Sequence, residues 1–216
     1  MSVTTKQLSL DEIFRQRRSI RKYKATRPQE EWLFKMLHGA SFSPSPSNSQ
    51  PVRFIWVHSN KARKNLQEAM SSGRAKFLTA IENKTGTKRI RNWINSYYRF
   101  SEFMFSAPEI FAVGIKKNIA SFSDKMIEAG LLSHYDDKES SLEISLGLAL
   151  QDFLLKGSEL GLGTCVMTAP LVFIPNIEEV LGIDDLKIKC LVTVGFADES
   201  PEKLKKKDGV DILRKI

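Results

Sequence analysis

Apolar residues recur every three or four positions in several parts of the chain, which is the pattern of helices with one buried face. The first such segment lies close to the N-terminus. Ser9 and Glu12 have the spacing of a capping box, in which each side chain bonds the other residue's backbone N–H. The apolar residues behind them predict a short helix that ends near Gln16.

Two further amphipathic segments follow before the middle of the chain. Thr26 and Gln29, with Pro28 in the first turn, predict the start of a helix that stops near Gly39. Another helix is predicted over about residues 61–70.

The longest apolar segment predicts a central helix. Ser140 and Glu143 again have capping-box spacing, and the helix that they open runs to about Glu159, with Gly161 as the residue that ends it. Because this helix is apolar on nearly all sides, we expect it to be central or to be buried on one side by a second subunit.

Three segments rich in β-branched and aromatic residues predict strands, over residues 52–57, 109–115 and 187–196. Residues 74–105 are basic and aromatic with helical spacing, and their place in the fold does not follow from the pattern. Strands separated by helices favour a sheet covered by helices. No linker interrupts the chain, so we expect one domain over residues 1–216.

Composition excludes several classes of protein. With 42% hydrophobic and 27% charged residues, the 216-residue chain is expected to fold around a substantial core. Its two cysteines lack CxxC spacing and its three histidines are scattered, so we expect no metal site and a reducing, cytoplasmic location. No apolar stretch reaches the roughly 18 residues of a membrane span.

The positive charge of the chain is concentrated in one segment. The formal net charge is +8, and residues 53–99 hold eleven Lys or Arg against two Glu. An anionic partner should therefore meet this segment first. Within it, Trp93, Tyr97 and Tyr98 allow three interpretations: a lid beside a substrate, stacking on nucleic acid bases, or ordinary helix packing.

Three polar or small-residue segments are candidates for a binding site. Residues 17–21 (RRSIR) offer guanidinium groups that bind phosphate, although such a cluster can also be a solvated turn. Residues 43–51 form a rigid loop with three prolines and several hydrogen-bonding side chains, or a plain connector. Residues 161–170 (GLGTCVMTAP) allow a flat ligand to approach the backbone, or form a packed strand.

The order of these segments resembles the FMN-dependent nitroreductase family. The resemblance rests on residues 17–21, on residues 45–51 (SPSNSQP), and on a long apolar helix that runs into residues 161–169, followed by a strand that ends in Val-Gly-Phe. It extends over about residues 10–207, and residues 74–140 match poorly, as a variable, basic, lid-like segment. The resemblance implies an α+β fold: a homodimeric three-layer α/β/α sandwich with a central, mainly antiparallel sheet.

The resemblance also implies two FMN sites at the subunit interface, and a role for particular residues. Arg17 and Ser19 would face the phosphate and ribityl chain, and Arg21 would stabilise negative charge at the N1–O2 side of the flavin. The full set of cofactor-binding residues that it implies is Arg17, Arg18, Ser19, Arg21, Ser45, Pro46, Ser47, Asn48, Gln50, Val166, Met167, Thr168, Ala169, Lys205 and Lys207. The loop residues among them would reach the FMN of the other subunit.

The implied activity is a ping-pong transfer of electrons from NADH or NADPH to a small organic acceptor such as a nitro compound or a quinone. The chain departs from the family pattern at Val52, where many members carry Trp, and at Thr168, where some carry an acid. These departures affect the expected class of acceptor more than the expected cofactor. Two alternatives remain at this point, an FMN-storing or sensing dimer without turnover and a basic module that binds nucleic acid.

Overall fold

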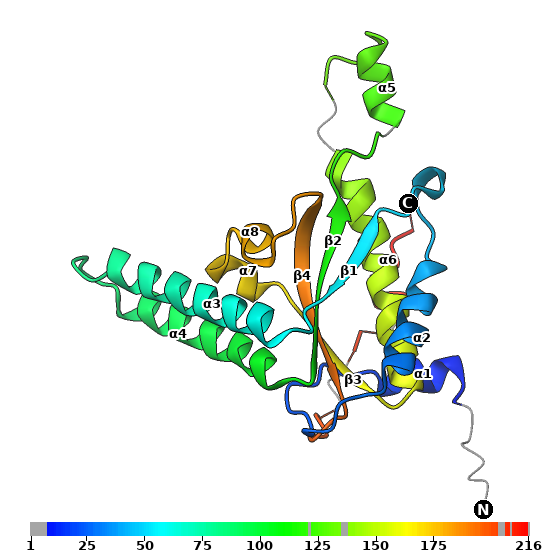
Figure 1. Cartoon of the computed structure of the whole chain (residues 1–216). Coiled ribbons are helices and arrows are strands. Elements are labelled where there is room, and N and C mark those ends of the chain that lie inside the picture. The colour runs from blue at the N-terminus through cyan, green and yellow to red at the C-terminus, as the bar shows by residue number, and fades with distance from the viewer. Residues whose placement is uncertain (1–7, 121, 135–137, 203–205, 208, 216) are drawn as a thin grey trace, which may run out of the picture.

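A four-stranded antiparallel sheet forms the centre of the molecule (Figure 1). In this computed structural model, residues 8–120, 122–134, 138–202, 206–207 and 209–215 are described. The strand order is β1-β2-β4-β3, with β1 at Val52–Trp56, β2 at Glu109–Lys116, β4 at Leu186–Gly195 and β3 at Gly163–Met167. All three predicted strands are confirmed. The inner strands β2 and β4 are buried almost throughout, which explains their near-continuous apolar sequence.

Three helices cover one face of the sheet: α1 (Leu10–Gln16), α2 (Glu30–Ser41) and α6 (Lys138–Glu159) (Figure 1). The core beneath them is mainly aliphatic and contains a group of packed phenylalanine rings. The ring of Phe153 stacks on Phe54 with centroids 4.8 Å apart and meets Phe111 edge-on at 5.5 Å. The prediction that α6 is central is therefore confirmed on the side that faces the sheet.

The other face is covered by α3 (Asn60–Ala80), α7 (Ala169–Phe173) and α8 (Ile177–Leu181). Helix α4 (Lys88–Glu102) packs along α3, and the pair extends away from the sheet as a helical hairpin that we call the arm (Figure 1). The mixed α/β architecture with an antiparallel sheet agrees with the fold that the sequence implied.

The predicted start of α2 was wrong. The helix begins at Glu30, and its N-cap residue Gln29 makes no side-chain hydrogen bond to the first turn. Pro28 is buried before the cap instead of lying in the first turn. The helix also continues two residues past Gly39, to Ser41.

The ends of the longer helices also differ from their predictions. Helix α3 continues ten residues beyond the predicted end at residue 70, and α4 and the short helix η2 (Phe103–Ser106) account for most of the unassigned segment. Helix α6 begins at Lys138, so Ser140 is not its cap, and Glu143 forms an ion pair with Lys189 at 2.8 Å.

The C-terminal end of α6 was predicted correctly. Gly161 has a φ of 75°, and its N–H bonds to the carbonyl of Ser158. The N–H of Leu162 bonds to the carbonyl of Gly157 at 2.8 Å. This pair of bonds is a Schellman motif, which uses the left-handed conformation that glycine adopts readily.

Residues 74–140 do not form one continuous lid. They contain the outer part of the arm, the inner strand β2 and a second projection that carries α5 (Phe122–Glu128) (Figure 1). Two further short 3-10 helices lie in loops, η1 at Pro46–Asn48 and η3 at Gly209–Ile212.

Candidate functional site

The segment that follows α1 is held against the edge strand β3. Ile20 N–H donates to the carbonyl of Thr164 at 2.9 Å, and Ser19 and Thr164 form a parallel β-bridge. The Tyr23 hydroxyl donates to the carbonyl of Ile20 at 2.6 Å and lies 2.7 Å from Thr193 Oγ1. Burial raises the pKa of Tyr23 well above its usual value, so this hydroxyl stays protonated. The fold thus brings residues 17–21 together with residues 161–164.

A glycine makes this close approach possible. A Cβ atom at Gly163 would lie 2.7 Å from Cγ1 of Ile20, which is too close for a real contact. Gly163 therefore has a packing reason, since it lets the arginine-rich segment lie directly against β3.

A cavity of about 310 Å³ lies where these two segments meet. Arg15, Arg17 and Arg18 line it from the N-terminal side, and Ser158 lines it at the end of α6. We call it the arginine cavity. Among the described residues that line it, Glu199, which follows β4, is the one acid. The lining of this cavity is therefore suited to an anion.

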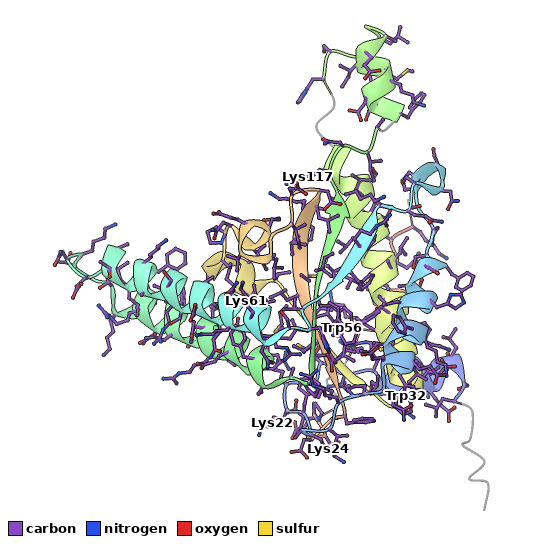
Figure 2. All side chains as sticks on the ribbon, viewed as in Figure 1. Lys22, Lys24, Trp32, Trp56, Lys61 and Lys117 are labelled. Atoms are coloured by element: carbon purple, nitrogen blue, oxygen red, sulfur yellow. The ribbon has the colours of Figure 1, made fainter. Side chains whose placement is uncertain are left out.

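The charges around the arginine cavity are only partly compensated. Glu199 accepts backbone hydrogen bonds from Arg21 and Lys22, and Arg18 donates to the carbonyl of Glu202. Figure 2 shows that Lys22 and Lys24 project from the same end of the molecule. Within the described ranges, the half-buried guanidinium of Arg17 has no hydrogen-bond or ion-pair partner. A partly desolvated cation of this kind favours an anionic ligand.

The proline-containing loop lies elsewhere and has an unusual backbone. Ser47, Asn48 and Gln50 have φ values of 50°, 52° and 45°, in the left-handed region that non-glycine residues seldom adopt. Ser45 Oγ accepts the N–H of Gln50 at 2.9 Å, and Arg53 donates to the carbonyl of Gln50 at 2.9 Å. Strained backbone of this kind, held by specific hydrogen bonds, is typical of binding loops.

One chain does not bring this loop to the arginine cavity. Ser145 of α6 lies beside the loop, in a cavity that Ser45 and Gln50 also line, whereas Ser158 lines the arginine cavity. At 1.5 Å per helical residue these two serines are roughly 20 Å apart. A small ligand bound at the arginines therefore does not reach the loop of the same chain.

The last predicted segment runs along β3 toward the arm. Val166 is exposed, whereas Cys165 and Met167 are buried. Burial raises the pKa of the Cys165 thiol. Thr168 and Ala169 line a second, larger cavity of about 650 Å³ between the arm and α7, which we call the arm cavity.

Comparison with known proteins places the chain in a family. A family model described as the Nitroreductase family matches residues 14–196. The chain belongs to the nitroreductase family. This confirms the resemblance drawn from residues 17–21, 45–51 and 161–169.

Individual relatives of this nitroreductase-family chain are distant but cover nearly its full length. It is 25% identical to the iodotyrosine deiodinase of Thermotoga neapolitana over 198 residues, which are 90% of this chain and 91% of the relative. A BluB-like flavoprotein from Clostridium difficile 630 has a similar fold, with a TM-score of 0.81, 22% identity and 97% and 99% of the two chains covered. The NADPH:FMN oxidoreductase from Vibrio harveyi, complexed with NAD+, gives a TM-score of 0.68 at 16% identity, covering 95% of this chain and 76% of that one.

Sequence reasoning missed several residues of this candidate site. Tyr23, Glu199 and Arg15 position or line the arginine cavity, yet none belongs to a recognisable motif. The only sequence signal that Arg15 belongs to the site was its position two residues before Arg17. Glu199 lies far along the chain and carried no local signal.

Two lysines that the resemblance implied as cofactor-binding residues are not placed at the arginine cavity. Lys205 lies outside the described residues, and Lys207 is exposed in the C-terminal segment. In the part of the chain that the structure describes, no three His, Cys, Asp or Glu side chains come together as a metal site. Over the same part, each helix is too short or too polar to cross a bilayer.

Proposed function

We propose that the chain is a single FMN-binding domain that pairs with a second copy and transfers electrons from NADH or NADPH to a small organic acceptor. The arginine cavity is the observation that carries this proposal. It offers a half-buried Arg17, whose guanidinium has no partner among the described residues, beside Gly163 and Thr164 of β3. The name of the Vibrio harveyi relative, an NADPH:FMN oxidoreductase, supports the same pairing of cofactor and donor.

The residues of the arginine cavity fit the phosphate end of FMN. A phosphate dianion needs cationic donors, and Arg17 and Arg18 supply guanidinium groups that bind phosphate oxygens in pairs. Ser19 would face the ribityl chain from its position beside Thr164 of β3. Arg21, exposed beside Glu199, would place positive charge at the N1–O2 side of the ring, where reduction adds negative charge.

The edge of β3 fits the flat part of FMN. Val166 presents an exposed apolar side chain, and Met167, Thr168 and Ala169 continue the same edge toward the arm cavity. Bound FMN would supply the redox chemistry, accepting a hydride from NAD(P)H and passing two electrons to the acceptor, which also takes up two protons, the second of them from water. The residues of this chain would bind and orient the cofactor.

A second copy would complete the site. The strained loop, with Ser45, Pro46, Ser47, Asn48 and Gln50, is roughly 20 Å from the arginine cavity of its own chain, so it would serve the FMN of the partner. The helix face beside it is suited to pairing, because α1, α2 and α6 expose large apolar side chains, among them Phe14, Phe34, Phe42, Ile144 and Leu148. Lys205 and Lys207 would add positive charge near the phosphate.

Flavin content and reduction test the proposed function. We expect purified protein to be yellow, and anaerobic NADH or NADPH to bleach the flavin absorbance. Arg17→Ala should weaken FMN binding about tenfold or more, because a charge-assisted bond to phosphate contributes roughly 1.5–3 kcal/mol. Arg91→Ala on the arm is the matched control and should leave FMN affinity unchanged.

Other outcomes would contradict the proposal in identifiable ways. Flavin that binds but is not reduced by either nicotinamide would indicate a storage or sensing protein. A colourless protein whose binding to random DNA falls steeply with salt would instead favour a nucleic-acid module. Unchanged FMN affinity in Arg17→Ala would remove Arg17 from the site.

A further inference from the structure

We propose that the arm cavity binds the electron acceptor, and that this acceptor is a flat aromatic molecule with one anionic group and no ammonium group. The proposal rests on the function proposed above, because it places the acceptor at the end of the flavin-binding edge. It is argued from the shape, the apolar lining and the charge of the cavity.

The cavity is built from apolar side chains of three helices. Ile90, Trp93 and Tyr97 form a stripe on α4 with spacing of three and four residues, and they are 45%, 52% and 58% exposed. Phe77 of α3 and Val172 of α7 line the cavity opposite them. Leaving this much apolar surface in water is unfavourable, and an aromatic ligand would cover it.

The size and position of the cavity fit a small acceptor. Its volume of about 650 Å³ lies within the range of roughly 300–1,000 Å³ that is usual for small-molecule sites. Thr168 and Ala169 line it, and they directly follow β3. A ligand in the cavity would therefore lie at the end of the edge proposed to hold the flavin ring.

The charge of the lining restricts the ligand further. Lys84 is the one charged side chain among the described residues that line the cavity, and no Asp or Glu lines it. Two nearby arginines are already engaged, since Arg74 bonds Asn95 and lies over the ring of Tyr98, and Arg89 lies 4.6 Å from the ring centre of Trp93. An anionic group on the ligand would pair with Lys84.

An ammonium group would have no such partner. Moving an unpaired charge from water into an apolar cavity is costly, so cationic and zwitterionic aromatics should bind poorly. The cavity therefore argues against an amino acid such as iodotyrosine as the acceptor, despite the 25% identity to an iodotyrosine deiodinase.

Three probes with the same ring and nitro group test the charge preference: 4-nitrobenzoate (anionic), 4-nitrobenzamide (neutral) and 4-nitrobenzylamine (cationic). Binding is measured by calorimetry on the full chain as purified, and turnover by anaerobic mixing with the reduced protein. We expect 4-nitrobenzoate to bind about fivefold more tightly than 4-nitrobenzamide, the gain of one partly exposed ion pair. The amine should bind most weakly.

Two variants and their matched controls locate the site. Ala80→Trp fills the cavity from the last residue of α3 and should weaken 4-nitrobenzoate at least tenfold, whereas Ala75→Trp, exposed on the same helix and outside the cavity, should not. Lys84→Gln should reduce the preference for 4-nitrobenzoate over 4-nitrobenzamide to within twofold. Lys88→Gln, exposed and outside the lining, should retain the preference.

The outcomes separate this inference from the proposed function. If FMN is bound and bleached by NAD(P)H but Ala80→Trp binds 4-nitrobenzoate as tightly as the parent, the inference is wrong and the function stands. If no FMN binds while calorimetry shows the expected order of probes and variants, the cavity is a ligand site and the redox function is wrong. Equal affinity for all three probes, or tightest binding of the amine, overturns the charge argument.

Discussion

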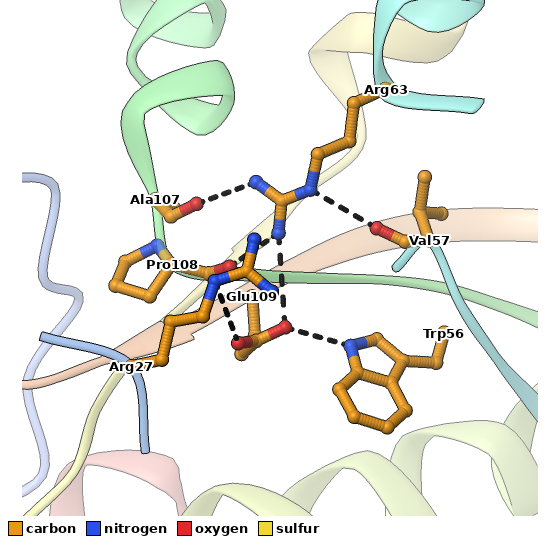
Figure 3. Close-up of polar contacts among 7 residues, drawn as sticks. All are labelled: Arg27, Trp56, Val57, Arg63, Ala107, Pro108 and Glu109. Carbon is orange, nitrogen blue, oxygen red and sulfur yellow. Dashed lines mark hydrogen bonds and ion pairs between the residues drawn. The ribbon is translucent and has the colours of Figure 1, made fainter. Parts of the chain in front are cut away.

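Glu109 is the most completely buried acidic side chain in the described core, at 1% exposure, and it connects the arm to the sheet (Figure 3). Its carboxylate accepts a hydrogen bond from Trp56 Nε1 at 2.8 Å and pairs with Arg27 and Arg63 at 3.8 Å each. Arg63, in the first turn of α3, also donates to the carbonyls of Val57, Ala107 and Pro108. Burial lowers the pKa of Arg63, and the charge of Glu109 opposes that effect.

Removing the charge of Glu109 should therefore be costly. In Glu109→Gln the guanidinium of Arg63 would remain largely buried without its counter-charge, and we expect a loss of roughly 3 kcal/mol in the free energy of unfolding. Urea denaturation followed by tryptophan fluorescence measures this. Glu68→Gln, which removes an exposed pair with Lys64, is the control and should change stability by no more than about 0.5 kcal/mol. A loss below about 1 kcal/mol for Glu109→Gln would show that the network is not an anchor.

Among the residues of the proposed site, some roles could be predicted from the sequence and others could not. The arginine-rich segment and the strained loop are each a short continuous stretch of sequence, so the chemistry of each could be recognised without a structure. Glu109 and Glu199 form their contacts with residues far along the chain, and no local pattern marks either of them.

At the scale of elements, the arm depends on one close helix contact. A Cβ atom at Gly73 of α3 would lie 1.9 Å from the carbonyl oxygen of Phe173, so α3 passes directly over the end of α7. The rings of Phe77 and Tyr98 then pack edge-on against Phe173 at 5.9 Å and 5.8 Å. The sequence predicted the end of this helix near residue 70, but α3 continues through Gly73, whose missing side chain allows the close contact.

Gly73→Ala tests this contact. The added methyl group would force α3 and α7 apart, and overpacking of this kind costs about 1–3 kcal/mol in the free energy of unfolding. Thermal or urea unfolding would show the loss. Gly39→Ala in α2 is the matched control, because its Cβ would lie at an ordinary 3.4 Å from Lys156 and alanine favours the helix by up to about 1 kcal/mol. Equal stability of the two variants would mean that α7 moves at no cost.

At the scale of the whole molecule, the proposed site is divided between two ends of the chain. The arginine cavity and the strained loop lie near opposite ends of α6, and the apolar face between them is exposed. A symmetric pair with antiparallel α6 helices would bring each loop to the arginine cavity of the partner. In a two-fold symmetric pair, a contact of one chain's loop with the partner's cavity is repeated between the partner's loop and the first chain's cavity.

Mixed pairs of defective chains test that arrangement. Arg17→Ala disables the cavity, and Asn48→Gly removes the loop side chain without adding strain at its positive φ. If each site uses Arg17 from one chain and Asn48 from the other, a heterodimer of the two variants has one intact site and should bind about one FMN per pair at wild-type affinity. Differential tags isolate the heterodimer, and absorbance gives its flavin content. No recovery relative to either homodimer would place both residues in one chain's site.

Much of the fold could be predicted because many of its elements depend on residues that are close together in the sequence. The strand segments, the Ser9–Glu12 capping box and the glycine end of α6 are confirmed, since each depends on residues within a few positions of one another. The start of α2, the length of α3 and the start of α6 were predicted wrongly. In α3 the helix continues through Gly73, where the missing side chain allows α3 to pack closely on α7.

By itself, the sequence determined the three strand segments, the family and the chemistry of the segments proposed to bind the cofactor, because charge, hydrogen-bonding groups and periodicity are properties of short stretches of chain. Tertiary structure alone decided that residues 17–21 lie on β3, that the loop lies roughly 20 Å from them, and that the arm forms a cavity with Lys84 as its one charged lining residue among those described. These depend on contacts between residues far apart in sequence. Such contacts form only where helix packing and strand pairing bring distant segments together.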